Sequence, residues 1–169
     1  VQRAIDDGAG IIVIHQAVAF PSELAEQGRA WLGGVYVTGE SVRGHWKSEH
    51  CSFPSHPVTR GVLPWKINDG WMSHIRFVES MRGVTPLLWS GKRDGGAPRG
   101  GTDDVVAWAY ERPGGGRSFT FTGLDAHSAW SHAGLRTLVG NGVLWAAGLE
   151  PPESSGLALS RTTSSKSRS

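Results

Sequence analysis

The sequence predicts an α/β domain with a mostly parallel sheet, helices on its faces and antiparallel strands at its edge. Three observations support this fold class. Residues 10–14 form a continuous, β-branched apolar run, which is typical of a strand buried on both faces. Residues 105–110 and 118–122 resemble the arms of a hairpin, because a Pro-Gly-Gly-Gly turn at 113–116 separates them. Residues 132–147 place apolar side chains at helical spacing.

The remaining elements follow in chain order. Residues 1–8 resemble the end of a helix that leads into the first strand, so we expect an N-terminally truncated domain that lacks earlier βα units. A helix is expected over residues 23–32, with Ser22 as its N-cap. Short strands are expected at residues 35–37, 65–68, 75–78 and 85–90. The polar segment 40–50 has no strand pattern, and Asn-Asp-Gly at 68–70 is a strong turn signal.

One domain accounts for most of the chain. With 169 residues, 38% of them hydrophobic, the chain can bury a real core, and we expect that domain at residues 1–150. Residues 151–169 are rich in Ser and poor in apolar side chains, which predicts a disordered tail. Residues 91–103 are rich in Gly, Arg, Asp and Pro, which predicts a mobile surface loop.

Composition excludes several function classes. Residues 1–150 carry 14 basic and 14 acidic side chains, and this balance argues against nucleic acid as a partner. No apolar run approaches the roughly 18 residues of a membrane span, so no membrane partner is expected. Cys51 is the single cysteine and cannot form an internal disulfide. Localisation stays open between cytoplasmic and exported. Eight Trp and seven His suit a pocket for a sugar or another polar small molecule.

The strongest candidate for chemistry is His15, at the end of the first predicted strand. Ligands of open α/β sheets bind at the carboxyl ends of such strands. An imidazole there indicates an acid, base, metal-binding or hydrogen-bonding role, whereas Ser or Cys would indicate acyl transfer. A second strand end carries Asp125 and His127, and we expect both ends to line one cleft. His15, Asp125 and His127 are therefore the predicted catalytic residues, with His127 as the expected partner of His15.

Other polar and aromatic residues lie between these two strand ends in the sequence. The predicted substrate-binding residues are His45, Trp46, Asp69, Trp71, His74 and Trp130. The candidate ligands of a divalent metal are His15, His45 and His127, since imidazole binds zinc and iron well. The chain has no compact metal signature such as His-Glu-x-x-His, so a metal cofactor stays open. Each Trp also has a structural alternative, because Trp fills cores as readily as it lines pockets.

Several motifs together carry a resemblance to a known family. They are Ile14-His15-Gln16-Ala17-Val18, His45-Trp46, His56-Pro57-Val58-Thr59-Arg60-Gly61, residues 67–77 and residues 123–130. In this order they resemble the ThuA-like (trehalose-utilisation) family over residues 8–152. The resemblance implies a flavodoxin-like fold of the class I glutamine-amidotransferase-like superfamily. It also implies carbohydrate metabolism, with a disaccharide or its 3-keto derivative as substrate. Glutaminase activity is not expected, because His15 stands at the elbow where amidotransferases have Cys.

The chain also departs from the family pattern. Relatives of this subtype tend to have Asn-Asp-Glu-Trp where this chain has Gly70, and Gly-Gly-His-Phe-His where it has Leu124 and Asp125. A missing carboxylate at position 70 removes a candidate acid or base. Two functions therefore stay open: an enzyme that hydrolyses, eliminates or isomerises a sugar, and a non-catalytic sugar-binding or interaction module with a degenerate site. A structural role in a larger multidomain parent and a homo-oligomeric state are further alternatives.

Overall fold

The structure is a computed structural model, and it describes residues 1–91 and 101–153. In chain order the helices and strands are α1 (Gln2–Asp6), β1 (Ile11–Ile14), α2 (Ala25–Leu32), β2 (Gly34–Val35), β3 (Val42–His50), β4 (Trp65–Ser73), β5 (Arg76–Phe77), β6 (Val84–Trp89), β7 (Val105–Glu111), β8 (Arg117–Phe121) and α3 (Ala133–Ala146). Most of the predicted mobile loop and of the predicted tail lies outside the described residues.

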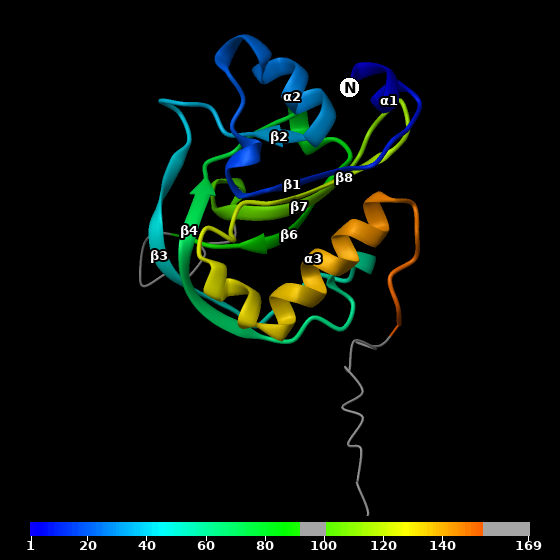
Figure 1. Cartoon of the computed structure of the whole chain (residues 1–169). Coiled ribbons are helices and arrows are strands. Elements are labelled where there is room, and N and C mark those ends of the chain that lie inside the picture. Colours follow the sequence, from blue (N-terminus) through cyan, green and yellow to red (C-terminus); the bar gives the residue numbers. More distant parts are fainter. Residues whose placement is uncertain (92–100, 154–169) are drawn as a thin grey trace, which may run out of the picture.

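A four-stranded sheet in the order β1-β8-β7-β6 forms the centre, with α2 above it and α3 below it in Figure 1. This confirms the mixed α/β class with flanking helices. The mostly parallel arrangement is not found in the described strands, because only β1 and β8 pair in parallel. The short turn between β7 and β8 explains the difference: it permits antiparallel pairing, whereas parallel neighbours need a long crossover.

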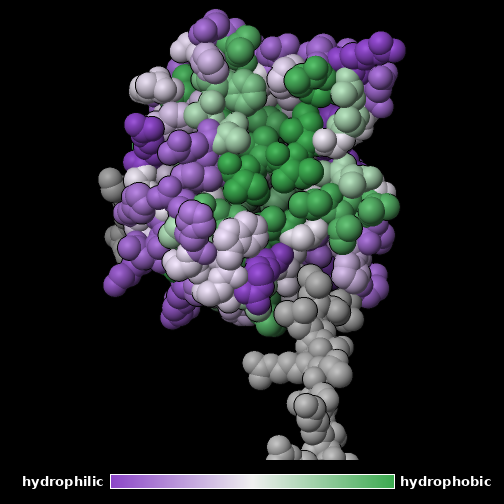
Figure 2. Space-filling model, in the orientation of Figure 1, coloured by the Kyte–Doolittle hydropathy of each residue, from purple (hydrophilic) through white to green (hydrophobic). Residues whose placement is uncertain are grey.

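The two faces of this sheet bury separate sets of side chains. On one face Phe119 packs so closely against Gly142 of α3 that a Cβ there would overlap its ring. On the other face the Trp108 indole N–H donates to the carbonyl of Leu32, at the end of α2. Figure 2 shows apolar residues gathered around the edge strand β1, where Ile12 is exposed. The sheet is therefore covered on both faces and open at β1.

The two longer helices lie where the sequence predicts them, but the predicted N-cap of the first is wrong. The expected C-terminal helix is confirmed as α3, and the expected helix over residues 23–32 is confirmed as α2 from Ala25 onwards. Ser22 is not its N-cap, because a short 3-10 turn over Ser22–Leu24 precedes it and no side chain caps α2. Within the two described ranges, no helix has the length and apolar character needed to cross a membrane.

The strands β3 and β4 form a separate antiparallel ribbon of nine residues each. Neither was predicted at this length, and the expected turn at Asn-Asp-Gly is wrong, since β4 continues through it. Side chains on the inner face of the ribbon, such as Trp46 and His50, are buried, whereas Arg43, His45 and Lys47 are exposed on the outer face. Because both faces carry polar residues, the usual alternation of apolar and polar side chains is too weak to reveal β3.

His50 lies on the inner face of the ribbon, between two indole rings. Its ring centroid is 4.8 Å from that of Trp65 and 5.4 Å from that of Trp71. Its Nε2 has no hydrogen-bond partner among the residues that the structure describes. Burial lowers the pKa of His50 from 6.5 to about 4, because the charged imidazolium cannot be solvated there. His50 is therefore neutral in the folded protein at pH 7.

This burial predicts a loss of stability in acid. Between pH 6.5 and about 4 the unfolded chain binds a proton at His50 that the folded chain does not bind. The free energy of unfolding should therefore fall by about 3 kcal/mol as the pH falls through this window, with the loss complete below it. Denaturant unfolding of His50→Leu, followed by Trp fluorescence, should show a weaker pH dependence. An unchanged pH dependence, equal to that of the exposed-site control His127→Gln, would contradict this account.

Candidate functional site

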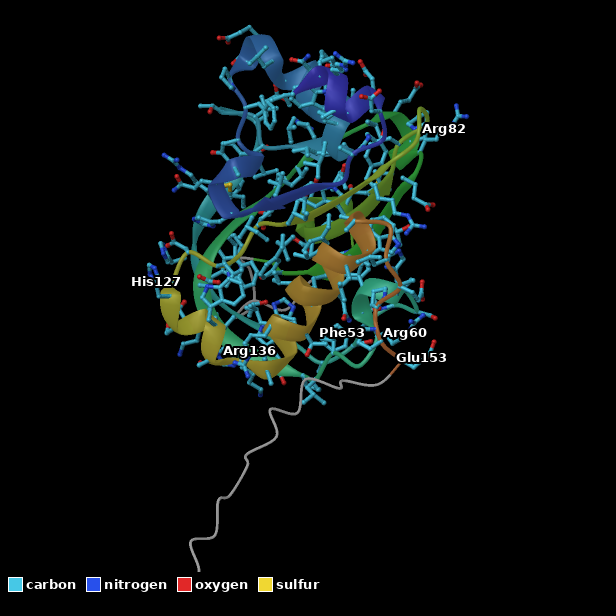
Figure 3. All side chains as sticks on the ribbon, turned by 45° about the vertical axis from the view of Figure 1, so that its right-hand side comes forward. Phe53, Arg60, Arg82, His127, Arg136 and Glu153 are labelled. Atoms are coloured by element: carbon cyan, nitrogen blue, oxygen red, sulfur yellow. The ribbon has the colours of Figure 1, made fainter. Side chains whose placement is uncertain are left out.

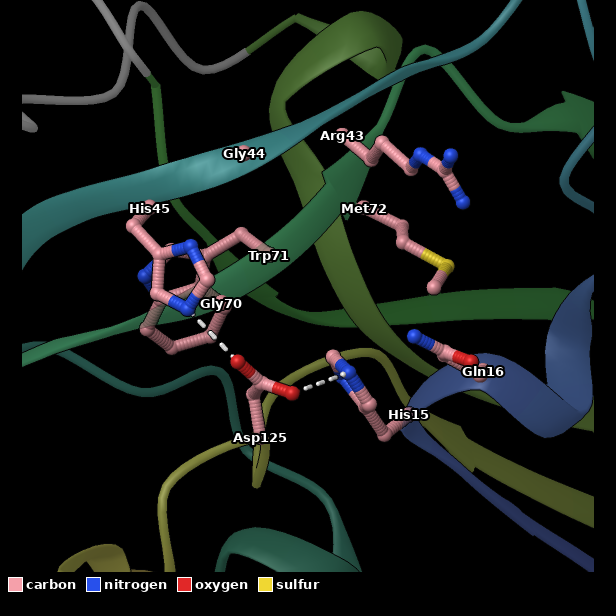
Figure 4. Close-up of a pocket in the computed structure, with 9 residues that line it drawn as sticks. All are labelled: His15, Gln16, Arg43, Gly44, His45, Gly70, Trp71, Met72 and Asp125. Atoms are coloured by element: carbon pink, nitrogen blue, oxygen red, sulfur yellow. Dashed lines mark hydrogen bonds and ion pairs between the residues drawn. The ribbon is translucent and has the colours of Figure 1, made fainter.

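A cavity of about 420 Å³ lies where the carboxyl ends of β1 and β8 meet the outer face of the β3–β4 ribbon (Figure 4). Its lining residues are His15, Gln16, Arg43, Gly44, His45, Gly70, Trp71, Met72 and Asp125. His15 directly follows β1, and Asp125 lies in the loop after β8. Because β1 and β8 are parallel neighbours, their carboxyl ends lie side by side. The two strand ends expected from the sequence thus meet in one pocket.

The carboxylate of Asp125 bridges two imidazoles in this pocket. Its Oδ2 lies 2.6 Å from Nε2 of His45, and its Oδ1 lies 3.0 Å from Nε2 of His15. The hydrogen bond from His45 and the proximity of His15 lower the pKa of Asp125 below its usual value. The exposed fraction of the side chain rises from 17% at His15 to 35% at Asp125 and 66% at His45. The cluster therefore runs from the protein interior to solvent, with an ionised carboxylate at its centre.

The other ring nitrogen of His15 contacts a backbone carbonyl. Nδ1 lies 2.9 Å from the carbonyl oxygen of Thr122, which can only accept a hydrogen bond. Both ring nitrogens of His15 therefore face an oxygen: Nδ1 the Thr122 carbonyl, and Nε2 the Asp125 carboxylate at 3.0 Å. The backbone of His15 has φ +52°, a left-handed conformation that is uncommon for a side chain with a Cβ. Strain of this kind is often found at functional sites.

Asp69 holds the loop that carries Asp125. Its side chain is 0% exposed and lies on the inner face of β4. Its two oxygens accept hydrogen bonds from the backbone N–H groups of Gly70, Leu124, Asp125 and Ala126, at 2.7–3.1 Å. These bonds hold Leu124 at φ +74°, a conformation that non-glycine residues rarely adopt. Asp69 therefore positions the pocket from behind and does not line it.

Gly70 provides the space that Asp125 occupies. In the ribbon Gly70 is the direct partner of His45, so a side chain at position 70 would point to the same face as the imidazole. A Cβ built at Gly70 would lie 2.7 Å from Cβ and 2.8 Å from Oδ2 of Asp125. The space beside His45 is thus filled by the carboxylate of Asp125 from the facing loop, and position 70 has no room for a side chain of its own.

The other candidates from the sequence lie elsewhere. Trp46 is buried and its indole N–H donates to Ser90, while His74 lies 3.9 Å from a carboxylate oxygen of Asp103. Trp130 and His127 are exposed in the 3-10 turn before α3, and Figure 3 shows His127 at the surface. None of these four residues lines the pocket. Of the predicted substrate-binding residues, His45 and Trp71 do.

Three lining residues that carry a side chain were not among the predicted site residues: Gln16, Arg43 and Met72. Gln16 directly follows His15, and Arg43 lies two residues before His45 on the same face of β3. Met72 is the direct partner of Arg43 on β4. The signal that could have found Arg43 is the two-residue period of a strand through His45, but no strand was expected there.

The metal ligands expected from the sequence do not come together. His127 is outside the pocket, and both oxygens of Asp125 already contact imidazoles. In the described part of the chain, no group of three or more His, Cys, Asp or Glu side chains could hold a metal ion. The residues present therefore fit an acid–base cluster better than the proposed His15, His45 and His127 ligand set.

The first prediction from this site concerns Asp69. In Asp69→Asn one oxygen is replaced by an NH₂ group that faces backbone donors, so we expect the free energy of unfolding to fall by about 3 kcal/mol. The reverse exchange at the exposed neighbouring residue, Asn68→Asp, should change it by less than about 0.5 kcal/mol. Urea unfolding followed by Trp fluorescence measures both, and equal effects of the two variants would show that Asp69 has no special role.

The second prediction concerns the space at Gly70. Gly70→Ala should cost about 1–3 kcal/mol, because the added Cβ overlaps Asp125. In an Asp125→Gly background the same substitution should cost much less, since the overlapping atoms are gone. A double-mutant cycle measures this coupling energy. If the cost of Gly70→Ala is the same in both backgrounds, the two positions do not share the space.

Comparisons with known proteins match this architecture. The family model ThuA, described as trehalose utilisation, matches residues 1–146. No curated protein matches the chain. The crystal structure of a ThuA-like protein from Bacteroides uniformis aligns with a TM-score of 0.60 and 15% sequence identity, over 89% of this chain. The alignment spans 64% of that protein, and at this identity it shows a shared fold. The family model covers most of the sequence, and the chain therefore belongs to the ThuA family of trehalose-utilisation proteins.

Proposed function

We propose that the chain binds a sugar in the pocket at His15 and His45 and transfers a proton to or from it. The observation that supports this proposal is the bridging of His15 and His45 by the Asp125 carboxylate. A general acid or base needs a titratable group that a second group holds in one orientation, at a place that a substrate can reach. His45 meets both conditions, because Asp125 orients it and most of its ring is open to solvent.

In this proposal His45 is the base. Its Nε2–H donates to Asp125, which leaves the lone pair of Nδ1 for a substrate proton. With a 3-keto sugar as substrate, the C–H bond next to the ketone breaks, the proton goes to Nδ1, and the electron pair moves to the ketone oxygen as an enolate. This step begins both an elimination and an isomerisation.

The same geometry disfavours a glutaminase. Such an enzyme needs a thiol in the pocket, and Cys51, the single cysteine of the sequence, is exposed and lies just after the end of β3. The corresponding place after β1 is taken by His15. We infer that this chain does not hydrolyse glutamine.

A second candidate is a non-catalytic sugar-binding module. The exposure of His45 favours it. Active sites often exclude water from their reacting groups, whereas the side chain of His45 is 66% exposed. In this case the polar groups of the pocket would form hydrogen bonds with sugar hydroxyls, and no proton would be transferred. The two candidates differ in turnover and not in binding.

Kinetics with trehalose and 3-keto-trehalose separate the two candidates. If His45 is the base, Asp125→Asn and His45→Gln should each lower kcat/KM by about 10²–10⁴-fold for the substrate that turns over. His127→Gln, outside the pocket, should leave it unchanged. Sugar binding by calorimetry without turnover would support the binding module. Turnover that survives both Asp125→Asn and His45→Gln would remove the bridged cluster from the mechanism.

A further inference from the structure

Arg43 is a charged side chain in the pocket wall without a counterion. It makes no hydrogen bond or ion pair with any residue in the described ranges, and the side chain of Gln16 makes no hydrogen bond there either. Both line the pocket that contains Asp125. In Figure 4 the guanidinium of Arg43 and the amide of Gln16 lie toward one end of the pocket, and His45 with Asp125 lies toward the other.

We propose that Arg43 and Gln16 bind the carboxylate of an acidic sugar, so that the substrate class is a uronic or aldonic acid or a glycoside of one. This inference rests on the proposed function and adds the charge of the substrate to it. The planar guanidinium presents paired N–H donors that match the two oxygens of a carboxylate. The amide of Gln16 adds a further donor, and its oxygen can accept from a sugar hydroxyl.

The charges of the pocket select a carboxylate over a phosphate. Asp125 already contacts both imidazoles, whereas Arg43 has no anionic partner among the described lining residues. One positive charge matches the single negative charge of a carboxylate. A phosphate dianion would bring a second negative charge into a pocket that already holds the Asp125 carboxylate. The subsite therefore fits a monoanion.

The position of Arg43 also explains how such a substrate would be oriented. Arg43 and His45 lie two residues apart on one face of β3, and residues at this spacing are about 7 Å apart along a strand. This distance is comparable to the width of one sugar ring. A carboxylate held at Arg43 would place the opposite side of the ring near the imidazole of His45, where the proposed proton transfer takes place.

Matched sugars and matched variants test this inference. Binding of D-glucuronate, D-glucose and acetate should be measured by calorimetry, with the Nε–H signal of Arg43 followed by NMR. We expect D-glucuronate to bind at least about tenfold more tightly than D-glucose and to shift the Arg43 signal. Arg43→Ala should remove the preference and Arg43→Lys should keep part of it. The control is Lys47→Ala. Lys47 lies two residues after His45 on the same face of β3, just as Arg43 lies two residues before it, but Lys47 does not line this pocket.

The outcomes separate this inference from the proposed function. Equal binding of D-glucose and D-glucuronate would overturn the inference and leave the sugar pocket in place. Binding of acetate as tight as that of D-glucuronate would mean recognition of the anion alone and would overturn the inference. A preference for D-glucuronate that survives Arg43→Ala, or no binding of D-glucuronate at all, would also overturn the inference.

Discussion

Four backbone N–H groups converge on the buried carboxylate of Asp69, and three of them belong to the loop that carries Asp125. A buried carboxylate is stable when its oxygens are satisfied in this way. The consequence is geometric: the loop after β8 is fixed against β4, and Asp125 points into the space above Gly70. His15 and His45 meet through Asp125, so the order of the whole pocket depends on this interaction behind it.

The two faces of the β3–β4 ribbon have different roles: the inner face stabilises the fold, and the outer face lines the pocket. The inner face buries Trp46, His50 and Asp69, which pack or hold the loop. The outer face presents Arg43 and His45 to the pocket. A two-residue period makes this division possible within a single pair of strands. It also explains why neighbouring residues such as His45 and Trp46 have unrelated environments.

The sequence predicted the features that depend on local pattern. The strand ending at His15, the hairpin of β7 and β8 and the helix α3 follow from apolar runs, a glycine-rich turn and helical spacing. The expected burial of the first strand on both faces is wrong, because β1 lies at the edge of the sheet and Ile12 is exposed. It did not predict β3, because the partner that stabilises this polar strand lies some twenty residues away in β4. It named His15, His45 and Asp125 among the candidate site residues, and the structure brings these three together, but it paired His15 with His127, which lies outside the pocket. Proximity in the chain placed His127 beside Asp125, whereas the loop geometry turns it to solvent.

The shared space between Gly70 and Asp125 makes these two positions depend on one another. A side chain at position 70 would overlap the Cβ and the carboxylate of Asp125. A larger residue at position 70 therefore costs stability unless residue 125 becomes smaller at the same time. The pair behaves as a single unit of substitution, in which either the loop or β4 supplies the side chain beside His45, but not both.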